Sequence, residues 1–140
     1  MKRIFETPTI KKVWVNGTFD VLHPGHIKLL EFAKAQGDHL AVGLDTDERV
    51  TNLKGEGSPF HTLEDRMFAI RSIKYVDEVF AFSSDDELRE LMMAYNPTIH
   101  VIGSDYIEQY KRIVGLGIAE DLVFFDRLED YSSSRIIQNI

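Results

Sequence analysis

An eleven-residue stretch, residues 16–26, constrains the fold of this chain more than any other feature. It has the sequence NGTFDVLHPGH and follows the apolar run 13–15. Consecutive apolar residues predict a buried strand, because a strand covered on both faces shows no alternation. The amphipathic run 27–35 predicts a helix that begins at Pro24, since proline is favoured in the first helical turn. We therefore expect a strand–turn–helix unit with His23 and His26 in the turn and the first helical turn.

The carboxyl end of a parallel strand is the place where open α/β sheets bind ligands. A helix N-terminus at that place favours anions, because its first N–H groups lack partners and the helix dipole is positive there. His23 and His26 lie three residues apart and add ring N–H donors to the same end. Together they predict a site for phosphate oxygens, whereas either histidine alone would be more typical of a turn or a helix cap.

Composition restricts the class of protein. The chain has 140 residues, a hydrophobic fraction of 44% and no cysteine, which predicts one domain with a core and no disulfide or thiolate site. No apolar run is long enough to cross a bilayer and no signal peptide is visible, so we expect a cytoplasmic protein. The formal net charge of −7 argues against a broad nucleic-acid surface, although a small anion needs only a local basic pocket.

Strand-like and helix-like runs alternate along the chain, which predicts βαβ units and a parallel sheet. The expected strands are residues 12–16, 39–44, 78–82, 98–102 and 122–125. The expected helices are residues 24–36, 63–74, 85–95, about 107–114 and 135–140. Five parallel strands with helices on both faces form a Rossmann-like α/β fold, here as one domain over residues 1–140. The polar segment 45–62 is expected to be a loop.

The Gly-Thr-Phe-Asp and His-x-Gly-His parts of this stretch resemble the signature of the cytidylyltransferase-like nucleotidyltransferases, which have the HIGH-type fold. The resemblance implies that His23 and His26 stabilise charge on a reacting α-phosphate. It also implies that three backbone positions lie along the triphosphate: Gly17, Thr18 and Phe19. No strong base is needed, because the acceptor oxygen is already anionic at neutral pH. Asp20 could hold a helix end or a histidine, or simply form the turn.

Further candidates follow later strands. Lys54, in the string LKGEGSP, resembles the lysine of the Lys-Gly loop of heptose-phosphate adenylyltransferases, where it would bridge phosphates, although Ser58 stands where that group often has arginine. Arg66 resembles the arginine of the family's Glu-x-Arg helix start and could pair inside the fold or contact substrate. Asp105, in GSDY, resembles part of a Gly-x-Asp-aromatic segment. The predicted substrate-binding residues are Asp45, Lys54, Arg66 and Asp105.

The last candidates lie near the end of the chain. The family's second signature is Arg-Thr-Glu-Gly-Ile-Ser-Thr-Thr, and residues 127–134 have RLEDYSSS at the aligned positions. The resemblance implies that Arg127 clamps the triphosphate and that Ser132, Ser133 and Ser134 donate hydrogen bonds to its outer phosphates from a helix N-terminus. A serine-capped terminal helix is the structural alternative.

Two activities fit these resemblances. Residues 73–79 and Arg127 look most like glycerol-3-phosphate cytidylyltransferases, which predicts transfer of CMP from CTP to an alcohol phosphate such as glycerol 3-phosphate, with release of pyrophosphate. The segments around Lys54 and Asp105 favour the alternative, an adenylyltransferase that uses ATP and a sugar 1-phosphate of the heptose-phosphate type. A pantetheine phosphate acceptor and a non-catalytic nucleotide-binding protein are further alternatives.

The predicted catalytic residues are His23, His26, Lys54 and Arg127. Mg²⁺ should accompany the nucleotide, held mainly by phosphates and water rather than by dedicated protein ligands. The resemblance also implies a homodimer. We expect no nucleic-acid or membrane partner.

Overall fold

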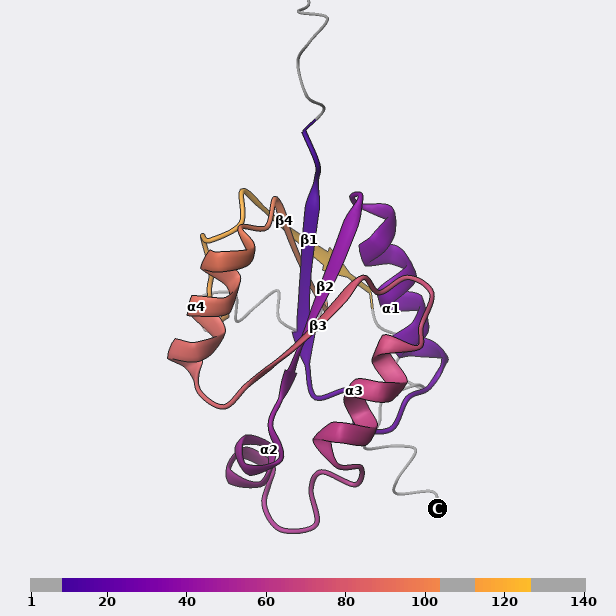
Figure 1. Cartoon of the computed structure of the whole chain (residues 1–140), viewed down its shortest axis with the longest axis vertical. Helices are drawn as coiled ribbons and strands as arrows, with labels where there is room; N and C mark the ends of the chain where they lie inside the picture. Colours follow the sequence, from indigo (N-terminus) through magenta and orange to yellow (C-terminus); the bar gives the residue numbers. More distant parts are fainter. Residues whose placement is uncertain (1–8, 104–112, 127–140) are drawn as a thin grey trace, which may run out of the picture.

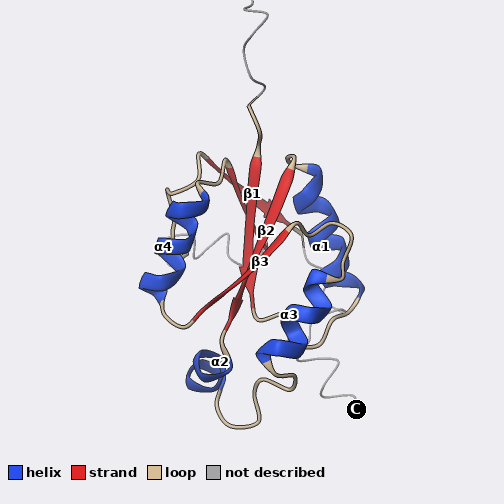
Figure 2. Cartoon of the chain, viewed as in Figure 1, coloured by secondary structure: helices blue, strands red, loops and turns tan. Residues whose placement is uncertain are grey.

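The computed structural model describes residues 9–103 and 113–126, and these form five strands and four helices. The strands are β1 (Lys12–Gly17), β2 (His39–Asp45), β3 (Glu78–Phe82), β4 (Ile99–Gly103) and β5 (Asp121–Phe125). The helices are α1 (Pro24–Ala35), α2 (Asp47–Lys54), α3 (Leu63–Arg71) and α4 (Asp85–Tyr95). Figure 2 shows the strands at the centre of the molecule, with the helices around them.

All five strands are parallel and lie in the order β3-β2-β1-β4-β5. The chain builds outward from β1 to β3 and then returns to the other side of β1 for β4 and β5. The connections from β1 and β4 therefore leave in opposite directions, and the carboxyl ends of these two strands flank a topological switch point. The expected Rossmann-like parallel sheet is confirmed.

Alternate side chains of β1 point to opposite faces of the sheet and contribute to two cores. Val13 packs with Leu30 of α1 and Ile70 of α3. The next residue, Trp14, packs with Met92 of α4 on the other face. Figure 1 shows α1 and α3 on one side of the sheet and α4 on the other, so the prediction of helices on both faces is confirmed.

The prediction of a loop over residues 45–62 is wrong in part, because residues 47–54 form α2. The hydroxyl of Thr46 accepts a hydrogen bond from the N–H of Arg49, and the acidic side chains of Asp47 and Glu48 suit the first turn. Val50 is the buried residue of this helix, so α2 lacks the apolar periodicity that predicts helices. Capping chemistry was the signal available in the sequence.

Other boundaries move by three residues or fewer. β4 occupies Ile99–Gly103 rather than 98–102, and α3 ends at Arg71 rather than at residue 74. The predicted helix at 135–140, most of the one near 107–114 and several site residues lie outside the described residues: Asp105, Arg127, Ser132, Ser133 and Ser134. Within the described part, no helix has the length and apolar character needed to cross a membrane.

Candidate active site

The two histidines of the predicted site form the start of α1. His23 is the N-cap, and its Nδ1 accepts a hydrogen bond of 3.0 Å from the N–H of Gly25. His26 is the third helical residue, and its Nδ1 accepts a bond of 3.3 Å from the N–H of His23. This is a capping box made of two imidazoles rather than of a hydroxyl and a carboxylate. It holds both rings, which stack with their centroids 3.8 Å apart.

These bonds assign the proton on each ring. A nitrogen that accepts an N–H bond is unprotonated, so in the neutral rings of His23 and His26 the proton lies on Nε2. Both side chains are buried, at 7% and 8% exposed. Two oriented ring donors therefore lie where the dipole of α1 is positive, an arrangement that suits a phosphate group.

The turn before the histidines is built around Phe19, whose φ of 48° lies in the left-handed region. This conformation costs a residue with a side chain roughly 1 kcal/mol or more, and burial of the ring offsets the cost. The Phe19 ring lies 5.4 Å from that of His26. A Cβ on Gly17 would lie 3.2 Å from Cε2 of Phe19, so the close approach at Gly17 is made by this ring. The contacts of residues 17–19 with a triphosphate stay a prediction.

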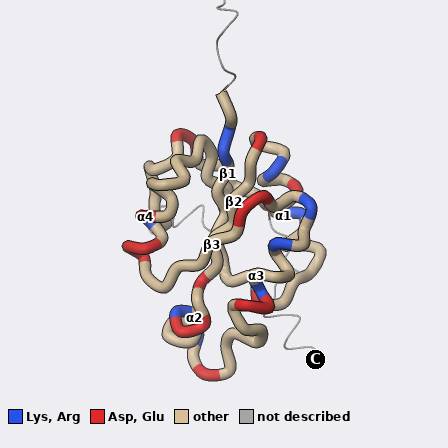
Figure 3. The backbone as a smooth tube through the Cα atoms, viewed as in Figure 1, with Lys and Arg blue, Asp and Glu red and all other residues tan. Residues whose placement is uncertain are grey.

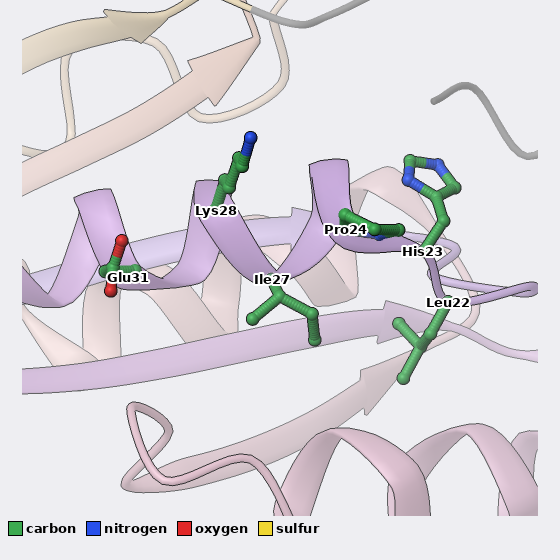
Figure 4. A pocket seen from close by; sticks show the side chains of 6 residues that line it. All are labelled: Leu22, His23, Pro24, Ile27, Lys28 and Glu31. Carbon is green, nitrogen blue, oxygen red and sulfur yellow. The ribbon is translucent and has the colours of Figure 1, made fainter. Parts of the chain in front are cut away.

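A shallow, open and mostly apolar pocket lies beside the start of α1 (Figure 4). Its lining residues are Leu22, His23, Pro24, Ile27, Lys28 and Glu31. Figure 4 shows His23 and Lys28 on the same side of α1. The candidates predicted from the sequence do not include Lys28. A basic residue within two helical turns of the histidines was the signal that could have identified it.

Asp20 lies in the turn between β1 and α1, three residues before His23. It binds a loop that follows about forty residues later in the sequence. Its carboxylate accepts hydrogen bonds from the N–H groups of Phe60 (2.6 Å) and His61 (2.7 Å). Both residues belong to the segment between α2 and α3, so Asp20 holds neither a helix end nor a ring of the histidine pair. It joins the turn after β1 to the loop before α3.

Arg66 is buried and makes four hydrogen bonds within the chain. Its guanidinium donates to the carbonyl oxygens of Thr18 (3.1 Å), Asp45 (2.8 Å) and His61 (3.1 Å), and to the Asp47 carboxylate (2.7 Å). The structure thus gives Arg66 the internal role, since it connects the ends of β1 and β2 with the starts of α2 and α3. A direct substrate contact stays a prediction.

Asp45, at the end of β2, is engaged by two neighbours. Its carboxylate pairs with Arg49 at 2.7 Å and accepts a hydrogen bond of 3.4 Å from the Thr18 hydroxyl. Arg49 also pairs with Asp85 at 2.6 Å, and Figure 3 shows acidic and basic positions adjacent on α2. Burial opposes the charge of Arg49, but the bonds to Asp85 and Asp45 outweigh it and raise its pKa above the ordinary value.

Lys54 is the last residue of α2 and is exposed. Its side chain forms no hydrogen bond or ion pair with residues 9–103 or 113–126. The structure therefore places Lys54 beyond the carboxyl end of β2 without bringing it to the histidine pair.

The fold and the histidine-capped helix define an α/β protein of the nucleotidyltransferase type. Residues 14–139 match the family model described as Cytidylyltransferase-like, and the chain belongs to that family.

Two relatives are proteins named Bifunctional protein HldE. The one from Helicobacter pylori strain P12 is 39% identical over 100% of this chain and 30% of its own length. The one from Helicobacter hepaticus strain ATCC 51449 / 3B1 is 40% identical over 93% of this chain and 26% of its own length. The chain therefore spans less than a third of these relatives.

Solved structures agree on the fold. A lipopolysaccharide core biosynthesis protein from Thermoplasma volcanium GSS1 is 26% identical with a TM-score of 0.70, over 86% of this chain and 100% of that chain. A pantothenate synthetase from Thermus thermophilus is 18% identical with a TM-score of 0.59, over 91% of this chain and 61% of that chain, and it shares the fold alone.

The HldE relatives overturn the predicted CTP-dependent transfer to glycerol 3-phosphate and favour the alternative, the heptose-phosphate type. The structure explains the error. Residues 73–79, which suggested the cytidylyltransferase, lead into the start of β3. They lie at the amino ends of the strands, whereas the histidine pair lies at the carboxyl ends. At the amino ends the Asp77 carboxylate binds Lys34 and the N–H of Leu40. The residues of this segment that carried the likeness therefore contact α1 and β2 at the amino edge of the sheet, away from the histidine pair.

Proposed function

We propose that this chain transfers AMP from ATP to a sugar 1-phosphate of the heptose-phosphate type and releases pyrophosphate. The observation that carries the proposal is the stacked His23–His26 pair, which the start of α1 orients at the carboxyl edge of the sheet. The HldE relatives support the choice of ATP and of a sugar phosphate over CTP and glycerol 3-phosphate.

The reaction needs charge stabilisation more than proton transfer. An oxygen of the acceptor phosphate attacks the α-phosphorus of ATP in line, and the bond from that phosphorus to the bridging oxygen breaks. Pyrophosphate leaves with the electron pair of that bond. The Nε2–H groups of His23 and His26 donate to the α-phosphate and to the bridging oxygen, where negative charge builds. The acceptor is already ionised, so neither ring removes a proton.

Cationic side chains complete the proposed site. Lys28 lines the pocket beside His23 and neutralises nucleotide phosphates, and Lys54 supplies a point charge for the acceptor phosphate. Arg127 and three serines bind the outer phosphates: Ser132, Ser133 and Ser134. Mg²⁺ would accompany ATP and would neutralise part of the charge on its phosphates.

Pyrophosphate release measured for four substrate pairs tests the proposal. ATP and CTP are each combined with a heptose 1-phosphate and with glycerol 3-phosphate, in the presence of Mg²⁺. We expect the pair of ATP and heptose 1-phosphate to give a kcat/KM at least about a hundredfold above the others, because a site built for one acceptor leaves polar groups unpaired with another. Faster turnover of CTP with glycerol 3-phosphate would contradict the proposal. ATP binding without pyrophosphate release from any pair would instead favour a non-catalytic nucleotide-binding protein.

A further inference from the structure

Hydrogen bonds connect the backbone of His61 to the turn between β1 and α1, directly through Asp20 and indirectly through Arg66 of α3. The N–H of His61 donates to the Asp20 carboxylate, which also accepts the N–H of Phe60. Its carbonyl oxygen accepts from Nε of Arg66, and the same guanidinium binds the carbonyl oxygen of Thr18. Figure 1 shows the chain between α2 and α3 at the carboxyl edge of the sheet. Residues 60 and 61 are thus tied to residues 18–20, about forty positions earlier.

The loop over residues 55–61 gains little from apolar burial. Phe60 is 64% exposed, and Leu53, just before the loop, is 68% exposed. Gly55 and Gly57 have φ values of 95° and 88°, and no heavy atom lies within 4 Å of the Cβ that either would carry. The bond from the Thr51 hydroxyl to the carbonyl oxygen of Ser58 attaches the middle of the loop to α2. Polar contacts, rather than the core, therefore set the position of this loop.

We propose that Asp20 is a positioning residue of the transfer reaction, whose carboxylate holds the loop after Lys54 against the turn that carries His23 and His26. This inference rests on the proposed function, in which Lys54 binds the acceptor phosphate and the histidines bind the nucleotide. Hydrogen bonds to a carboxylate are short and strong, so they fix the backbone at Phe60 and His61 closely. The placement matters because a misplacement of about 1 Å between reacting groups can cost roughly a hundredfold in rate.

Asp77 provides a matched control at the other edge of the sheet. Its carboxylate also accepts a backbone N–H, that of Leu40 at 2.8 Å, and it pairs with Lys34. Loss of either carboxylate removes bonds that attach a loop to a neighbouring element. If both aspartates served the fold alone, their amide variants would lose stability and keep wild-type kinetics.

The test compares the Asp20→Asn and Asp77→Asn variants of the full chain. Kinetics with ATP and heptose 1-phosphate are measured by pyrophosphate release, and affinity for a non-hydrolysable ATP analogue by calorimetry. We expect Asp20→Asn to raise the KM for the sugar phosphate about tenfold and to lower kcat about tenfold, with analogue affinity within about twofold of wild type. Asp77→Asn should keep wild-type kinetics. Wild-type kinetics in Asp20→Asn, or an equal loss of analogue affinity, would overturn the inference.

Two further variants keep the test decisive if Asp20→Asn does not fold. Asp20→Glu keeps both acceptor oxygens and displaces the loop by one methylene, so it should fold and show a smaller rise in acceptor KM. The Asp20→Glu/Lys54→Ala double variant should lose no more than about twofold beyond Lys54→Ala, because coupled residues are not additive. Additive losses would show that Asp20 does not act through this loop. An inactive wild type would overturn the proposed function itself, whereas an active wild type with unchanged Asp20 variants would overturn this inference alone.

Discussion

The carboxyl ends of the parallel strands form one edge of the sheet and their amino ends form the other. Polar side chains at these two edges have different environments. At the carboxyl edge, His23, His26 and Arg66 are buried. At the amino edge, Lys34 and Asp77 form an ion pair in which the side chains are 30% and 34% exposed. Burial of polar groups costs free energy unless every group finds a partner, whereas exposed pairs cost and contribute little. Buried polar groups are therefore concentrated at the carboxyl edge, where Arg66 serves the fold through four internal hydrogen bonds and the two histidines are the groups proposed to bind a ligand.

The largest expected effect separates chemistry from stability at the carboxyl edge. His23→Ala and His26→Ala should each lower kcat by roughly two to three orders of magnitude, because each removes a donor to the transition state. His23→Asn should keep the helix cap, since asparagine is a good N-cap, and should still lose activity. Pyrophosphate release and thermal unfolding measure the two properties. His39→Gln, at the amino edge, is the control and should leave kcat unchanged. Near-wild-type turnover in both alanine variants would show that the carboxyl edge contributes no more to the chemistry than the amino edge.

The next effect concerns the stability of the same edge. Arg66→Met should destabilise the fold by roughly 3 kcal/mol or more, because it leaves three carbonyl oxygens without their buried donor. Arg89, which pairs with Asp86 on the exposed surface of α4, is the matched control. Arg89→Met should change the free energy of unfolding by less than about 1 kcal/mol. Urea unfolding of both variants makes the comparison, and equal losses would show that burial of the guanidinium is unimportant.

The third expected effect is a pH dependence of the unfolding free energy. It comes from His100, which lies in β4 between the carboxyl and amino edges. Nε2 of His100 has no hydrogen-bond partner in the described structure, and burial lowers the pKa of this ring from 6.5 to about 4. The unfolded chain therefore binds a proton below pH 6.5 that the folded chain does not bind until about pH 4. The unfolding free energy is therefore unaffected by His100 protonation above pH 6.5. It decreases by roughly 3 kcal/mol as the pH falls to about 4.

Urea unfolding across this pH range, compared with the His100→Leu variant, isolates the contribution of His100. The variant should show a flatter dependence of unfolding free energy on pH between 4 and 6.5. Identical slopes would mean that the ring is protonated in the folded protein. The activity profile need not follow this slope, because His23 and His26 lie at the carboxyl edge and His100 lies within β4.

The sequence predicted much of the fold and the position of the two histidines at the start of α1. Side-chain patterns showed the strands, and the spacing of His23 and His26 placed both rings at one helix start. The partners of Arg66 could not be predicted, because three of them are carbonyl oxygens, which every residue has. The contact of Asp20 with the loop before α3 joins backbone groups about forty residues away, and no local pattern specifies such a pairing.

The smallest expected effect belongs to the amino edge. Burial alone would raise the pKa of Asp77, but the bonds from Lys34 and from the N–H of Leu40 outweigh it and hold the pKa below its ordinary value of 3.8. A lowered carboxyl pKa stabilises the fold above that pH, and the contribution is lost as the pH falls below it. Because the pair is partly exposed, Asp77→Asn should cost less than about 1 kcal/mol at pH 7 and less still at an acidic pH below 3.8. Urea unfolding at both pH values measures the difference. A loss at pH 7 as large as that of Arg66→Met would show that the exposed edge contributes as much to stability as the buried one, and the contrast between them would fail.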